Sequence, residues 1–114
     1  MDEGVCRIDV WLWRARFFKT RGLAARFVEG GKVRRTRPGS GEVRLDKASR
    51  TARQSDHLVF VLGSRLIDLT ILSCGDRRGP AAEARALYRL EGELTSGSGQ
   101  PMSGAAQNEP SSPE

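Results

Sequence analysis

The sequence has few of the residues from which catalytic and metal sites are usually built. Its 114 residues include two cysteines and a single histidine, His57. Cys6 and Cys74 are far apart and form no C-x-x-C pair, whereas a structural zinc site needs four ligands. His57 has no serine or cysteine partner in a recognisable catalytic arrangement. The sequence therefore indicates no catalytic residue, no metal ligand and no cofactor, which argues against an enzyme. We expect both thiols to be reduced, with a disulfide bond between them as the alternative.

Long apolar runs are also missing. No stretch approaches the roughly 20 apolar residues that a membrane-spanning helix needs. The N-terminal sequence MDEGVCR is acidic and lacks the apolar segment of a signal peptide. We therefore expect a soluble, cytoplasmic protein that does not associate with membranes.

Acidic residues are scarce where basic residues are dense. The formal net charge is +5 and the pI is about 10.0. The last twenty residues contain two glutamates but no lysine or arginine, so the excess positive charge belongs to the rest of the chain. Such a distribution is typical of proteins that bind polyanions. The alternative is solubilising charge on solvated faces.

The segment 7–33 has the periodicity of two helices joined by a short turn. One face of the first helix would carry Ile8, Trp11, Leu12, Ala15 and Phe18. We expect Asp9 to cap this helix and Thr20 to cap the second one. Gly30 and Gly31 should end the second helix, because glycine enters the left-handed conformation without steric cost.

Two hairpins are expected after the helices, each made of two strand-like segments joined by turn residues. The segments are 32–37 and 42–46 in the first hairpin, and 57–62 and 65–73 in the second. Pro38-Gly39-Ser40-Gly41 and Gly63-Ser64 have the composition of the two turns. The connection 47–57 is expected to be extended, with at most one short strand.

The C-terminal part is expected to contain a helix and a disordered tail. Pro80 is tolerated in a first helical turn, and residues 81–90 have helix-forming composition. Residues 95–114 are rich in Ser, Gly, Pro and Gln and have no apolar periodicity, so they cannot offset their ordering entropy. The predicted α+β fold packs two helices against a small twisted antiparallel sheet. The predicted divisions are a flexible leader (1–6), the main domain (7–73), a loop and C-terminal helix (74–94) and the tail (95–114).

Basic residues of the helix pair, the first hairpin and the following connection could form one phosphate-binding surface. Each phosphate that a cation neutralises releases condensed counterions, and a helix N-terminus adds backbone N–H donors. The candidates are Arg7, Arg14, Arg16, Lys19, Arg21, Arg26, Lys32, Arg34, Lys47 and Arg50. In the alternative interpretation, Asp9, Glu29 and Asp46 cap helices or pair with these arginines.

Val10, Trp13 and Phe17 form a second apolar stripe on the first helix. One possibility is that the C-terminal segment covers this stripe, and this is the interpretation we favour. The alternative is that the two rings are exposed and stack on unpaired bases.

The segment 7–33 resembles the S4-type RNA-binding domain. The likeness rests on Arg7-Ile8-Asp9, Leu12, Thr20-Arg21, Ala24, Val28, Gly31 and Val33. Two longer strings, W-L-W-x-A-R-F-x-K-T-R from Trp11 and R-R-G-P-A-x-E-A from Arg77, are typical of the bacterial ribosome-associated fifteen-kilodalton heat-shock proteins. Ser55 stands where the family usually has glycine before Asp56, and Val10 stands where it usually has lysine.

The resemblance implies an αL fold that binds ribosomal RNA on its helical and hairpin surface. It further implies action, in the cytoplasm, on large ribosomal subunits that dissociated while still holding a nascent chain on tRNA. The residues that the resemblance places at the RNA surface are Arg7, Lys19, Thr20, Arg21, Arg26 and Lys32. We expect a monomer.

Three other functions remain as alternatives. One is a DNA-binding helix-turn-helix regulator, which is disfavoured because Gly22-Leu23-Ala24-Ala25 offers few polar side chains to base edges. The others are an RNA-binding subunit of an RNA-modifying enzyme and an intrinsic ribosomal protein.

Overall fold

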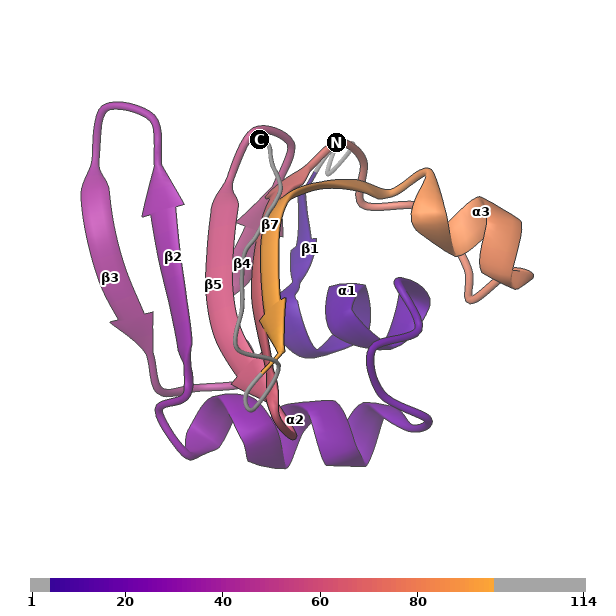
Figure 1. The fold of residues 1–114 in the computed structure, drawn as a ribbon, viewed down its shortest axis with the longest axis horizontal. Helices are drawn as coiled ribbons and strands as arrows, with labels where there is room; N and C mark the ends of the chain where they lie inside the picture. The colour runs from indigo at the N-terminus through magenta and orange to yellow at the C-terminus, as the bar shows by residue number, and fades with distance from the viewer. Residues whose placement is uncertain (1–4, 96–114) are drawn as a thin grey trace.

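The helices of this chain pack against a twisted antiparallel sheet in the computed structural model, which describes residues 5–95. The helices are α1 (Ile8–Arg14), α2 (Arg21–Glu29) and α3 (Ala81–Arg85). The strands are β1 (Val5–Arg7), β2 (Val33–Arg37), β3 (Gly41–Leu45), β4 (Thr51–Arg53), β5 (His57–Leu62), β6 (Arg65–Ile71) and β7 (Tyr88–Thr95). The main sheet has the order β3-β2-β5-β6-β7, and β1 and β4 form a separate pair. The predicted α+β class is confirmed, and α2 lies across one end of the sheet (Figure 1).

The first helix is shorter than its apolar periodicity predicts. It ends at Arg14 because Arg16 adopts a left-handed backbone with φ of 67°. The N–H of Arg16 then bonds to the carbonyl of Trp13, and the N–H of Phe17 bonds to that of Leu12. This pair of bonds is the Schellman ending of a helix, with arginine at the position where glycine is usual.

The predicted caps are right for the second helix and wrong for the first. The hydroxyl of Thr20 accepts from the N–H of Leu23 at 3.1 Å, and Gly31 has a φ of 74° just beyond the end of α2. Asp9 does not cap α1, whose N-cap residue is Arg7. The Asp9 carboxylate instead accepts from the Arg7 guanidinium and from the next backbone N–H.

The helix pair is anchored by buried side chains of both helices. Ile8, Trp11 and Leu12 of α1 are fully buried, as are Ala24 and Val28 of α2. They belong to one core with the inward residues of the sheet, and the Trp11 indole donates to the carbonyl of Ser73 at 2.9 Å. Because that bond satisfies the only polar atom of the ring, Trp11 can be buried without penalty.

Both predicted hairpins are present. In the first, Val33 lies opposite Leu45 and Arg37 opposite Gly41, across the Pro38–Ser40 turn. In the second, His57 lies opposite Thr70 and Leu62 opposite Arg65. Pairing of β2 with β5 joins the two hairpins into one sheet, and β4 is the single short strand expected in the connection.

At the two ends of the domain, the structure differs from the predicted segments. Val5 and Cys6 were expected in a flexible leader, but they form β1, where Cys6 pairs with Ala52. The helix predicted over 81–90 ends at Arg85, and β7 follows. Strand β7 pairs along the whole of β6, which would otherwise expose an unpaired edge, so tertiary pairing overrides helix propensity. Of the predicted tail, Thr95 ends β7 and 96–114 lie outside the described residues. Both cysteines are free thiols.

A buried ion pair holds the first hairpin to the turn before β5. Asp56 is fully buried and accepts two hydrogen bonds of 2.9 Å from Arg37, together with the N–H of Arg53 at 3.0 Å. The hydrogen bonding to Asp56 raises the pKa of Arg37. Burial, and secondarily the charge of Arg37, lower the pKa of the neighbouring Arg35, which donates to the carbonyl of Thr51.

Replacement of Arg37 by alanine should strongly destabilise the protein, because it leaves the buried Asp56 carboxylate without its counter-charge. We expect Arg37→Ala to lower the free energy of unfolding by about 3 to 5 kcal/mol. Chemical denaturation followed by circular dichroism measures this loss. Arg53→Ala removes the same charge from an exposed side chain and should stay within about 0.5 kcal/mol of the parent. Equal losses of unfolding free energy in the two variants would contradict the assignment of Arg37 and Asp56 as a stabilising buried ion pair.

Candidate nucleic-acid interface

The candidate basic residues separate into groups with different surroundings. All 19 lysine and arginine residues lie within 5–95 with 10 of the 14 acidic ones, so 19 cations against 10 acids leave this part a formal charge of +9. The charge is spread over α2, the β2–β3 hairpin and the loops beside α1. The contacts of each side chain decide which cations are available to a ligand.

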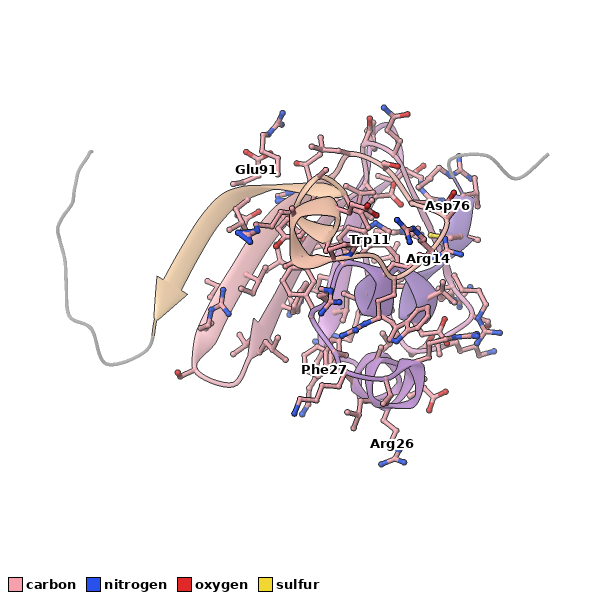
Figure 2. All side chains as sticks on the ribbon, turned by 90° about the vertical axis from the view of Figure 1, so that its right-hand side faces the viewer. Trp11, Arg14, Arg26, Phe27, Asp76 and Glu91 are labelled. Atoms are coloured by element: carbon pink, nitrogen blue, oxygen red, sulfur yellow. The ribbon has the colours of Figure 1, made fainter. Side chains whose placement is uncertain are left out.

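Helix α2 carries the most available cations. Lys19 and Arg21 flank the capping residue Thr20, and Arg26 lies a turn and a half further along. All three basic side chains are exposed, and none has an ion-pair partner among the described residues. Figure 2 shows Arg26 projecting from α2 away from the molecule. The Thr20 hydroxyl is used by the cap, so at this position a ligand would meet backbone N–H groups.

The positive surface continues around the glycine turn that follows α2. The ammonium of Lys32 lies 5.6 Å from the centre of the Phe27 ring. A Cβ atom at Gly31 would lie 3.4 Å from Cδ of Arg44, so Arg44 runs alongside this turn. Arg44 also lies directly opposite Arg34 in the hairpin. Like charges facing each other across a strand pair are unfavourable, and an anionic ligand would relieve the repulsion.

Three candidate arginines form ion pairs. Arg34 pairs with Glu42 at 3.4 Å and Arg50 with Asp46 at 3.7 Å, both between exposed side chains, whereas Arg7 pairs at 3.0 Å with the buried carboxylate of Asp9. About half of each arginine side chain remains accessible. The two exposed pairs contribute at most about 1 kcal/mol each, so a phosphate can replace the carboxylates of Glu42 and Asp46. Arg7 stays tied to Asp9, because losing this arginine would leave a buried carboxylate without its counter-charge. The neighbouring Lys47 is exposed.

Two candidate arginines hydrogen-bond to backbone carbonyls of the 74–79 loop, Arg14 from a partly buried position and Arg16 from an exposed one. Arg14 donates to the carbonyl oxygens of Cys74 and Gly75, at 3.2 and 2.9 Å, and its Nε is buried. Figure 2 shows its guanidinium beside the chain around Asp76. Arg16 donates to the carbonyl of Gly79 at 2.7 Å. The structure therefore does not gather all candidates on one surface: these two lie on the side of the 74–79 loop.

The sequence did not reveal the hydrogen bonds that run in the opposite direction, from the 74–79 loop to the α1–α2 turn. Arg78 donates to the carbonyls of Trp13 and Phe18, at 3.1 and 3.4 Å. The loop and the α1–α2 turn thus exchange hydrogen bonds in both directions. Arg44 was also absent from the candidate set, although strand alternation opposite Arg34 could have identified it.

The second apolar stripe is partly covered by the C-terminal segment. The ring of Phe17 lies 5.0 Å from that of Tyr88 in β7 and 5.4 Å from that of Phe60. The cover over Phe17 is therefore partial and comes from a strand instead of a helix, and the side chain remains half-buried. Trp13 is half-buried.

Residues 5–95 contain no helix with both the length and the apolar character needed to span a bilayer. The same residues hold no group of three or more His, Cys, Asp or Glu side chains arranged to bind a metal ion.

Known proteins resemble this chain in sequence and structure. The family model of the S4 domain matches residues 6–35. The heat shock protein 15 homolog of Aeromonas salmonicida is 57% identical over 87 residues, and heat shock protein 15 of Escherichia coli K12 is 40% identical over 91 residues. These matches cover 72% and 76% of this chain, but only 58% and 61% of the relatives, so the chain spans about three fifths of their length.

A solved structure supports the same likeness. The trimeric structure of Vibrio cholerae heat shock protein 15 matches with a TM-score of 0.66 and 36% sequence identity, covering 75% of this chain and 81% of that chain. The trimeric arrangement is that of the relative, and our expectation of a monomer remains untested against it.

Arginines with structural and with free side chains should respond differently to truncation. Arg78→Ala removes the arginine donor of the Phe18 carbonyl and one of the two donors of the Trp13 carbonyl, so we expect the free energy of unfolding to fall by about 1 to 3 kcal/mol. Arg21→Ala removes an exposed guanidinium and should change it by less than about 0.5 kcal/mol. Parallel denaturation curves of the two variants test the difference, and a larger loss for Arg21→Ala would contradict it.

Proposed function

Because the chain belongs to the heat shock protein 15 family of S4 domain proteins, we propose that it binds RNA through α2, the glycine turn and the β2–β3 hairpin. We name this the α2–hairpin surface, defined by Lys19, Arg21, Arg26, Lys32, Arg34 and Arg44. The observation that carries the proposal is the run of exposed cations on α2 and the glycine turn that lack carboxylate partners among the described residues. Such side chains can contact phosphates without first giving up a competing ion pair.

The shape of this surface favours folded RNA over a DNA groove. A helix that reads the major groove presents polar side chains to base edges along its exposed face. The exposed residues near the start of α2 include Gly22 and Leu23, which offer no hydrogen bond from their side chains. The cations instead sit at the two ends of α2 and on the adjoining hairpin, an arrangement suited to phosphates that are spread over a folded backbone.

The finer proposal concerns the RNA itself. We propose ribosomal RNA of the large subunit as the partner, in subunits that dissociated with a nascent chain still attached to tRNA. The resemblance to ribosome-associated heat-shock proteins supports this partner. We also propose a cytoplasmic location and a role in binding RNA without catalysing a reaction. An RNA-binding subunit of a modifying enzyme would use the same surface, and product analysis after incubation with ribosomal RNA separates the two.

Binding to a structured fragment of large-subunit ribosomal RNA should depend steeply on salt. About six phosphate contacts predict a slope of log affinity against log salt of roughly −4 to −6, because each contact releases counterions. Fluorescence anisotropy between low and physiological salt measures the slope, with duplex DNA as competitor. Affinity that hardly changes with salt, or equal competition by DNA, would contradict the proposal.

Single substitutions locate the surface. Arg26→Ala should weaken binding uniformly across RNA sequences and make the slope shallower by about 1, as expected for a phosphate contact. Arg53→Ala serves as the matched control, because Arg53 is exposed on β4 outside the α2–hairpin surface.

A further inference from the structure

A second cationic site lies on α3's side of the molecule. A pocket of about 230 Å³ opens between the α1–α2 turn, the start of β6, α3 and the first residue of β7. Arg16, Arg65 and Arg85 line it together with the rings of Phe17 and Tyr88, and alanines complete the wall. None of these described lining residues carries a carboxylate. In Figure 1, α3 and the β2–β3 hairpin stand at opposite ends of the molecule. No described residue that lines the pocket belongs to the α2–hairpin surface.

Two of the arginines can offer N–H groups to a ligand. Arg16 uses its Nε to bond to Gly79, and a guanidinium has four further N–H donors. Its left-handed backbone, unusual for a residue with a side chain, sets the turn that lines the pocket. Arg85 is exposed in the last turn of α3 and has no ion pair among the described residues. Planar guanidinium groups that converge on one space match the geometry of a phosphate.

The two aromatic rings in the pocket wall narrow the class of ligand that it could bind. Phe17 and Tyr88 are half-buried and lie with their ring centres 5.0 Å apart, at a tilt of 44°. A free phosphate needs no aromatic neighbour, whereas a nucleotide presents both an anionic group and a flat ring. The volume is below the roughly 300–1,000 Å³ of pockets that enclose drug-sized ligands, so a single nucleotide unit would be partly enclosed and a larger ligand would not fit.

We propose that this pocket binds one nucleotide unit, with its phosphate on Arg16 and Arg85 and its base against Phe17 and Tyr88. The unit has two sources: a free mononucleotide, or an unpaired nucleotide of a bound RNA. Only the second source rests on the proposed RNA-binding function.

The first test uses the full chain and small probes. Uridine and adenosine 5′-monophosphates and inorganic phosphate are titrated by calorimetry, and amide NMR shifts locate binding. We expect the mononucleotides to bind more tightly than phosphate and to shift Ala84 and Tyr88. Arg85→Ala should weaken mononucleotide binding about tenfold, as for loss of a hydrogen bond to a charged group. Arg53→Ala should leave it unchanged. Phosphate binding as tight as the mononucleotides, or equal losses in both variants, would overturn the proposal.

A second arm distinguishes the two sources. Where RNA supplies the nucleotide, uridine 5′-monophosphate competes at the pocket and Arg85→Ala lowers RNA affinity. Where the ligand is free, RNA affinity is the same with and without the mononucleotide, while Arg85→Ala still loses mononucleotide binding. If the α2–hairpin surface does not bind RNA, Arg26→Ala will leave RNA affinity unchanged. That result would not affect the mononucleotide titrations, which test the pocket alone.

Discussion

The arrangement of this domain depends on hydrogen bonds from arginine side chains to backbone carbonyls, exchanged between the α1–α2 turn and the 74–79 loop. Arg14 and Arg16 donate to the loop, and Arg78 donates back to the turn. Most of the accepting carbonyls lie in the loop or the turn, outside helices and strands, so these donors satisfy groups that burial would otherwise penalise. The same contacts hold the start of α2 and the wall of the α3 pocket in place.

This exchange also gives a physical meaning to the two sequence strings that suggested the family. The strings beginning at Trp11 and at Arg77 are about sixty residues apart, yet each supplies donors for the carbonyls of the other. Their basic residues therefore serve two purposes. Some hold the loop against the helices, whereas Lys19 and Arg21 at the end of the first string remain exposed. Basic composition alone does not separate these roles.

Features set by neighbouring residues could be predicted from the sequence. The Thr20 cap, the glycine end of α2 and both hairpins follow from local backbone chemistry, and all are present. Strands β1 and β7 could not be predicted in this way, because each forms only where a distant strand presents a free edge. The length of α1 was overestimated because arginine at a left-handed helix end carries no local signal.

In the candidate site, too, features set by neighbouring residues could be predicted and those set by distant segments could not. Exposed positions on α2 follow from helical periodicity, so Lys19, Arg21 and Arg26 were found. The hydrogen bonds of Arg14 and Arg16 depend on a loop that is distant in sequence, and charge cannot reveal them. Asp56 shows the same limit: it was noted only as a family turn position, whereas it is a buried partner of Arg37.

Arginine side-chain NMR can distinguish the arginines that are available to RNA from those held by hydrogen bonds within the fold. Each guanidinium gives its own Nε–H signal, which can be followed as a structured fragment of large-subunit ribosomal RNA is added to the labelled protein. We expect the signals of Arg21, Arg26 and Arg44 to shift or broaden, while those of Arg14 and Arg37 keep their positions. Large changes at Arg14 and Arg37 with the α2 signals unmoved would contradict this expectation.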